Sequence, residues 1–91
     1  MSVLIRFAPP SLTAQQYDDV VRRLYETGVF PADGLDYEIC FGPEGNRKVS
    51  QVWDSKKQME AFGARLMPIL AEFGINPGEP EIVEVHKIIK R

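Results

Sequence analysis

The stretch Val49 to Phe62, VSQVWDSKKQMEAF, decides the fold. Its first five residues, VSQVW, favour a strand that ends at Trp53, the only tryptophan of the chain. Either Asp54 or Ser55 can then accept hydrogen bonds from the first free N–H groups of a helix, and Gln58 lies three residues after Ser55, as in a capping box. The stretch therefore predicts a strand that passes directly into a helix.

That helix carries one apolar stripe, because apolar residues recur at spacings of three and four: Met59, Phe62, Leu66, Ile69, Leu70 and Phe73. Pro68 lies inside it, where a proline removes one hydrogen bond and clashes with the carbonyl four residues back. We therefore expect a kink near Ala64–Arg65 or a short separate helix from Met67 to Glu72. Gly74 is expected to end it.

The residues before this stretch predict a strand, a helix and another strand. Ser2 to Phe7 alternates in the manner of a strand and is stopped by two prolines. Thr13, with Gln16 three residues later, predicts a second capping box, and Gly28 is a suitable cap at the end of that helix near Thr27.

Two further strands flank a turn, and a last strand closes the chain. Leu35 to Phe41 alternates, a turn over 42–46 follows, and Arg47 to Trp53 should pair with it as an antiparallel hairpin. Glu81 to Ile89 is the last expected strand. The order β-α-β-β-α-β, with two right-handed crossovers, predicts an α+β ferredoxin-like plait over residues 1–91 as one domain. Its antiparallel sheet has strand order 4-1-3-2 and both helices on one face.

Composition narrows the function classes. The chain has 91 residues, of which 44% are apolar and 26% charged, typical of an ordinary soluble globule. A formal net charge of −2 argues against a nucleic-acid partner, because phosphate binding needs a basic face. No apolar run approaches a membrane span or a signal peptide. Cys40 is alone, which excludes an internal disulfide and fits a cytoplasmic protein.

One face of the predicted sheet lacks a helix layer. Alternation assigns one set of residues to the helix side: Val3, Ile5, Phe7, Tyr37, Ile39, Phe41, Val52, Val83 and Val85. It assigns the others to the open side: Leu4, Arg6, Glu38, Cys40, Val49, Gln51, Trp53, Ile82, Glu84, His86 and Ile88. The open side is too apolar for a free surface, so we expect a homodimer in which two sheets stack and enclose a cavity. A one-residue slip on either hairpin strand would exchange its faces.

The segments VWDS, KKQMEAFGARLMPILAEFG and VHKI together resemble the small dimeric α/β-barrel proteins, including the antibiotic biosynthesis monooxygenase-like domains and their uncharacterised relatives. The resemblance covers essentially the whole chain and implies a homodimer with a pocket between each sheet and its helices or loops. Some relatives are cofactor-independent oxygenases acting on polycyclic phenols, whose pocket is lined by a strand tryptophan with an asparagine and an arginine. Trp53 matches that tryptophan, and the asparagine position four residues earlier is Val49.

Five residues are candidates for a site. His86 and Glu38 are the acid–base candidates, His86 because its ordinary pKa lies near neutrality. Trp53 could stack a flat ligand, with polar contacts from Gln51 and Arg6. Each has a plainer alternative: an exposed histidine, a solvated strand carboxylate, a core tryptophan and two surface polar groups.

Two function classes stay open. One is a small-molecule enzyme, either monooxygenase-like or acid–base, acting on a small aromatic or phenolic compound; the other is a non-catalytic dimerisation or binding module. One histidine and one cysteine do not make a metal site, and no cofactor is expected. If Trp53 and His86 share the open face, strand spacing puts them roughly 10 Å apart, a gap that suits a flat ligand.

Overall fold

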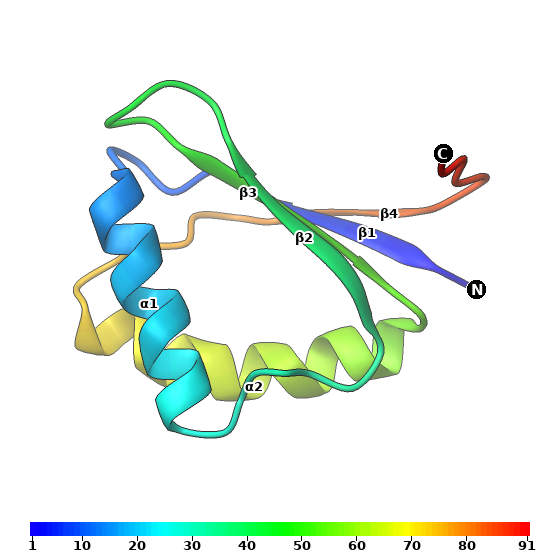
Figure 1. Ribbon diagram of the computed structural model, residues 1–91, viewed down its shortest axis with the longest axis horizontal. Helices are drawn as coiled ribbons and strands as arrows, with labels where there is room; N and C mark the ends of the chain where they lie inside the picture. Colours follow the sequence, from blue (N-terminus) through cyan, green and yellow to red (C-terminus); the bar gives the residue numbers. More distant parts are fainter.

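Six elements follow one another in the predicted order in the computed structural model, which describes all 91 residues (Figure 1). Their bounds are β1 (Val3–Phe7), α1 (Ala14–Glu26), β2 (Leu35–Phe41), β3 (Lys48–Trp53), α2 (Lys56–Glu72) and β4 (Glu81–Glu84). The four strands form one antiparallel sheet with the order β2-β3-β1-β4, and both helices cover the same face. The predicted ferredoxin-like plait and its strand order are confirmed. Neither helix is long and apolar enough to span a membrane.

Both helices begin where the sequence places their caps. At α1, the Thr13 hydroxyl accepts from the Gln16 N–H at 3.1 Å, and the Gln16 side chain accepts from the Thr13 N–H at 2.9 Å. At α2, Ser55 rather than Asp54 is the cap, because its hydroxyl accepts from the Gln58 N–H at 3.2 Å. These caps satisfy N–H groups that have no partner within the helix.

Helix α2 runs unbroken through Pro68, so the separate helix from Met67 does not form. Breaking the helix there would pull the buried side chains of Leu66, Ile69 and Leu70 out of the core. Burial stabilises each by about 1.5–3 kcal/mol, which together outweighs the roughly 3 kcal/mol that an internal proline costs.

The sheet register corrects the predicted faces. Val3 pairs with Trp53 and Ile5 pairs with Gln51, so Trp53 and Gln51 lie on the same face as these two buried residues of β1. The sequence had placed Trp53 and Gln51 on the open side. The assignment was right for β1 and wrong for β2, β3 and β4. The cause is Trp53, whose side chain is 0% exposed and whose ring lies 5.0 Å from that of Phe62 on α2. Burying the largest apolar side chain decides which face of β3 meets the helices.

The open face therefore carries the outward side chains of β2. Tyr37 and Ile39 are 37% and 48% exposed, and Val83 of β4 is 46% exposed. The Arg6 guanidinium lies 5.8 Å from the Phe41 ring centre on this face. The central Val52 is buried nevertheless, so the exposed apolar area lies on both flanks.

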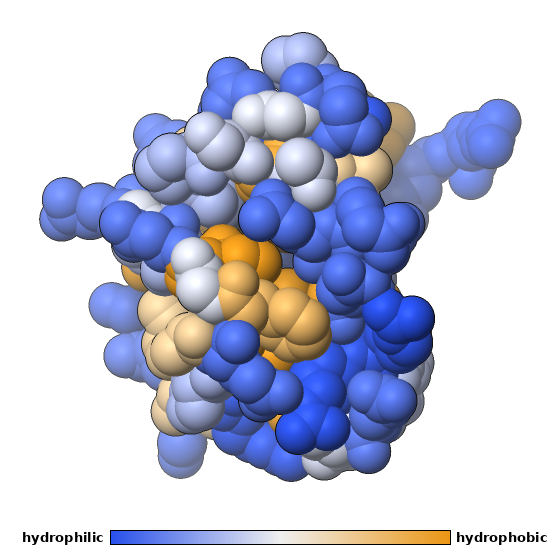
Figure 2. All heavy atoms as spheres, turned by 90° about the vertical axis from the view of Figure 1, so that its left-hand side faces the viewer, coloured by the Kyte–Doolittle hydropathy of each residue, from blue (hydrophilic) through white to orange (hydrophobic).

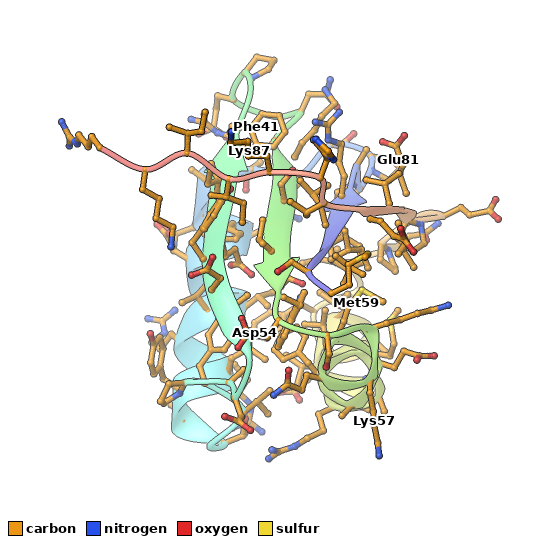
Figure 3. All side chains as sticks on the ribbon, turned by 90° about the vertical axis from the view of Figure 1, so that its right-hand side faces the viewer. Phe41, Asp54, Lys57, Met59, Glu81 and Lys87 are labelled. Atoms are coloured by element: carbon orange, nitrogen blue, oxygen red, sulfur yellow. The ribbon has the colours of Figure 1, made fainter.

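The last strand is shorter than expected. It ends at Glu84 instead of Ile89, because Glu84 already pairs with Val3, the first residue of β1. The remaining residues leave the sheet and cross from its β4 side toward β2 (Figure 3). There the Lys90 Nζ lies 3.1 Å from an Asp36 carboxylate oxygen.

Candidate functional site

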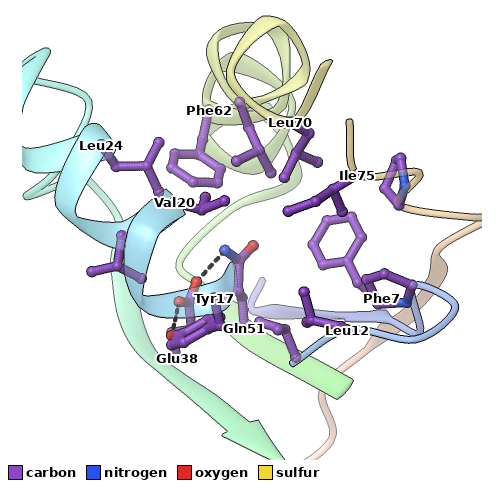
Figure 4. Close-up of a pocket in the computed structure, with 15 residues that line it drawn as sticks. Phe7, Leu12, Tyr17, Val20, Leu24, Glu38, Gln51, Phe62, Leu70 and Ile75 are labelled. Carbon is purple, nitrogen blue, oxygen red and sulfur yellow. Dashed lines mark hydrogen bonds between the residues drawn. The ribbon is translucent and has the colours of Figure 1, made fainter. Parts of the chain in front are cut away.

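A chain of hydrogen bonds connects four side chains on the helix side of the sheet, and Figure 4 shows three of them, Tyr17, Glu38 and Gln51. The Trp53 Nε1–H donates to Gln51 Oε1 at 3.0 Å, and Gln51 Nε2–H donates to Glu38 Oε1 at 2.6 Å. The Tyr17 hydroxyl donates to the other carboxylate oxygen of Glu38. The carboxylate of Glu38 on β2 is thus held from two sides, by Tyr17 of α1 and by Gln51 of β3.

The register explains why these side chains meet. Glu38 lies directly opposite Gln51 in the β2–β3 ladder, and both point toward the helices. Gln51 is 2% exposed, and a buried amide is costly unless its polar atoms have partners, which Trp53 and Glu38 supply. Tyr17 comes from the first turns of α1, whose start is fixed by the Thr13 cap.

The chain of hydrogen bonds borders a cavity of about 60 Å³ between the sheet and the two helices (Figure 4). Its other walls are mainly apolar: Phe7, Pro9, Leu12, Val20, Val21, Leu24, Val49, Phe62, Leu66, Leu70, Ile75 and Pro77. Figure 2 shows apolar side chains gathered at the surface of the molecule on the side where α1 begins and α2 ends. The site is thus an apolar hollow with one polar corner.

Burial fixes the protonation of Tyr17. Desolvation, together with the hydrogen bond and the negative charge of Glu38, raises the pKa of Tyr17 far above its ordinary 10.0. The hydroxyl therefore stays neutral and remains a donor to Glu38. Burial also raises the pKa of the Cys40 thiol, against the opposing charge of Arg47, so Cys40 is a thiol rather than a thiolate.

The polar corner has capacity left for a ligand. Each carboxylate oxygen of Glu38 accepts one hydrogen bond from the protein and has a further lone pair, while Gln51 Nε2 carries a second N–H. A hydroxyl on an otherwise apolar ligand could donate to Glu38 and accept from Gln51. Across the whole chain, no three His, Cys, Asp or Glu side chains are grouped so as to hold a metal ion.

The five predicted site residues divide into two groups. Glu38, Gln51 and Trp53 come together at the cavity, with Trp53 fully buried behind Gln51. Arg6 lies on the open face, and His86 is exposed beyond the end of β4. The predicted arrangement of Trp53 and His86 across the open face is wrong, because Trp53 faces the helices. The functional roles of all five stay predictions.

Sequence reasoning missed Tyr17. It lies on the apolar face of α1 with Val20 and Leu24, and its spacing identifies it as a core residue. The available signal was its polar tip, because a buried tyrosine hydroxyl usually needs a partner. The partner, Glu38, could be named only once the face of β2 was known.

Comparison with solved structures identifies the fold. SnoaB, a cofactor-independent oxygenase from Streptomyces nogalater, superposes with a TM-score of 0.64 at 12% identity, over 99% of this chain and 96% of that one. A candidate antibiotic biosynthesis monooxygenase from Deinococcus radiodurans superposes with a TM-score of 0.60 at 14% identity, over 100% of this chain and 98% of that one. No family model matches the sequence, and no curated protein matches it. The chain therefore shares the ferredoxin-like plait of these proteins.

The same fold also serves other purposes. The regulatory subunit of aspartate kinase from Thermus flavus superposes with a TM-score of 0.59 at 19% identity, over 91% of this chain and 51% of that one. Because one plait carries an oxygenase and a regulatory subunit, the function has to be argued from the site.

Proposed function

We propose that this chain binds a small aromatic compound carrying a hydroxyl group in the cavity between sheet and helices, and that Glu38 accepts the proton of that hydroxyl. The observation that carries the proposal is the inward carboxylate of Glu38, held by Tyr17 and Gln51 in a hollow whose other walls are apolar. A carboxylate turned away from water is costly unless hydrogen bonds replace the lost water, and a carboxylate placed in a cleft is a typical acid–base catalyst.

The chemistry is a proton transfer. The O–H bond of the bound phenol breaks, the proton passes to a Glu38 oxygen, and the negative charge moves to the phenolate oxygen. Gln51 Nε2–H then donates to the phenolate. A phenolate is electron-rich enough to react with dioxygen. One oxygen atom would enter the ring as a second carbonyl, the ring would be oxidised to a quinone, and the other oxygen atom would leave as water with the two hydrogens that the phenol loses. The likeness to SnoaB favours this monooxygenase-like extension.

A non-catalytic binding module is the second candidate. It is favoured by the small cavity, whose 60 Å³ holds only a few water molecules. Under this alternative, the Tyr17–Glu38–Gln51 contacts only stabilise the fold.

The proposal includes a cytoplasmic homodimer joined through the open sheet face. The aromatic and aliphatic side chains of β2 on that face, Tyr37 and Ile39, are exposed in one copy of the chain. A strand that turns its carboxylate inward and its apolar residues outward is unfavourable for a monomer. Stacking two sheets would cover those residues.

The test uses phenol and 1-naphthol as probes with the Glu38→Gln variant. Binding is measured by calorimetric titration, and turnover by dioxygen uptake. We expect wild type to bind 1-naphthol, and Glu38→Gln to bind at least about tenfold more weakly, since a charged hydrogen-bond acceptor is lost. Glu26→Gln, an exposed carboxylate on α1, is the control and should match wild type.

The readouts separate the candidates. Binding with dioxygen uptake that Glu38→Gln abolishes supports the enzyme, and binding without uptake supports the binding module. Equal affinity of wild type and Glu38→Gln would overturn the role of Glu38.

A further inference from the structure

A second hollow lies on the other side of Tyr17 and Glu38. It is a groove of about 300 Å³ between α1, the segment before β2, and β2 itself. Its walls are Tyr17, Val21, Tyr25, Phe30, Pro31, Ala32, Leu35 and Glu38. Three of these, Tyr17, Val21 and Glu38, also line the inner cavity. The inner cavity and this outer groove are therefore neighbours that share a wall.

The shared wall is closed by a hydrogen bond. Tyr17 reaches from α1 and Glu38 from β2, and the bond between them joins the helix to the sheet where the two hollows meet. Both residues are half-buried. Rotation of the Tyr17 side chain would break this one bond and connect the hollows. A ligand hydroxyl that donates to Glu38 in its place would restore the lost hydrogen bond.

The volumes of the two hollows favour a ligand that extends from the inner cavity into the outer groove. The inner cavity, at about 60 Å³, is far below the roughly 300 Å³ at which small-molecule sites begin. With the outer groove added, the space exceeds that bound. The polar group that can recognise a hydroxyl, Glu38, lies at the junction and faces both hollows.

The outer groove suits an aromatic ring. Tyr25 and Phe30 meet edge to face there, with ring centres 5.5 Å apart and planes at 62°. The remaining walls are aliphatic apart from Tyr17 and Glu38, so the groove offers no cationic partner for an anionic substituent. Aromatic pairs of this kind contribute stabilisation beyond simple burial.

We propose that Tyr17 and Glu38 form a gate, and that the ligand is an elongated aromatic alcohol whose hydroxyl sits at Glu38 and whose second ring lies in the outer groove beside Tyr25 and Phe30. This inference rests on the proposed function and adds the shape of the ligand. Ala32 and Tyr25 are then specificity-determining residues for the second ring.

Two probes of different length test the inference by calorimetric titration: phenol, which has one ring, and 4-phenylphenol, which has a second ring opposite its hydroxyl. Ala32→Phe fills the groove, while Tyr25→Ala removes an aromatic wall that is 60% exposed. Controls are Ala71→Phe, which adds the same bulk on an exposed turn of α2, and Tyr25→Phe, which keeps the ring.

We expect wild type to bind 4-phenylphenol more tightly than phenol. Ala32→Phe and Tyr25→Ala should each lower the affinity for 4-phenylphenol by roughly three- to tenfold and leave the affinity for phenol unchanged. Both controls should bind the two probes as wild type does. If 4-phenylphenol binding depends on Glu38 but neither groove variant weakens it, the groove inference is overturned and the proposed function survives. If neither probe binds wild type, both are overturned.

Discussion

Tyr17 shows how one side chain couples the site to stability. At neutral pH its hydroxyl donates to the Glu38 carboxylate across the gap between α1 and β2. A hydrogen bond to a charged group contributes about 1.5–3 kcal/mol. Replacing Tyr17 with phenylalanine should therefore lower the free energy of unfolding while leaving the ring in the core.

The pKa of Tyr17 sets the pH dependence of that contribution. Burial and Glu38 raise the pKa in the folded chain, so above the ordinary value of 10.0 the unfolded state loses a proton that the folded state keeps. The stability that Tyr17 contributes is fully present below pH 10 and is lost as pH rises beyond it.

Urea unfolding of wild type and Tyr17→Phe at about pH 8 and about pH 11 measures this effect. The difference in unfolding free energy between the two proteins should shrink at the higher pH. A difference that is the same at both pH values would mean that Tyr17 is not held neutral.

The residues of the site also show where sequence reasoning stops. Glu38 and Gln51 could be identified as polar candidates in strands, but alternation alone put them on the open face. In β2 the alternation misleads, because its apolar residues Tyr37, Ile39 and Phe41 lie on the open face. In β3 both faces carry apolar residues, so the pattern does not identify the face that meets the helices. The packing of Trp53 against Phe62 identifies that face. This contact joins β3 to α2, and the sequence alone does not tell which face of β3 meets the helix.

At the level of the elements, local signals were sufficient to predict the helix ends, although Pro68 did not divide α2 as expected. Thr13, Ser55 and Gly28 mark helix ends by hydrogen bonding and backbone conformation within a few residues, and each was predicted. The length of β4 was not predictable in this way. It depends on where its partner β1 begins, which is information from the opposite end of the chain.

Two glycines give a matched test of element stability. Gly63 lies inside α2, and an added Cβ would meet no atom within 4 Å, so Gly63→Ala should stabilise the chain by about 0.5–1 kcal/mol through helix propensity. Gly28 has equal space but a φ of +74°, so Gly28→Ala should destabilise it by about 1–2 kcal/mol. The midpoint of thermal unfolding should rise in Gly63→Ala and fall in Gly28→Ala. A loss of stability in Gly63→Ala would contradict the helix geometry.

At the scale of the whole molecule, the exposed flank of the sheet leads to the proposed dimer. Sedimentation at micromolar concentration should give about twice the 10.3 kDa mass of the chain. Ile39→Lys puts a charge on the open face and should yield the monomer. Met67→Lys, at a residue on α2 of similar exposure, is the control and should remain dimeric. A wild-type monomer would contradict the proposed assembly without affecting the cavity.

The proposed function requires an aromatic alcohol to bind inside the cavity with its hydroxyl at Glu38. A crystal structure of the wild-type chain with 4-phenylphenol tests it most directly. We expect ligand density between α1 and the sheet, with the ligand oxygen within hydrogen-bond distance of Glu38 and the Tyr17 hydroxyl turned away from the carboxylate. Density on the open sheet face, or a cavity unchanged at saturating ligand with the Tyr17–Glu38 bond intact, would contradict it.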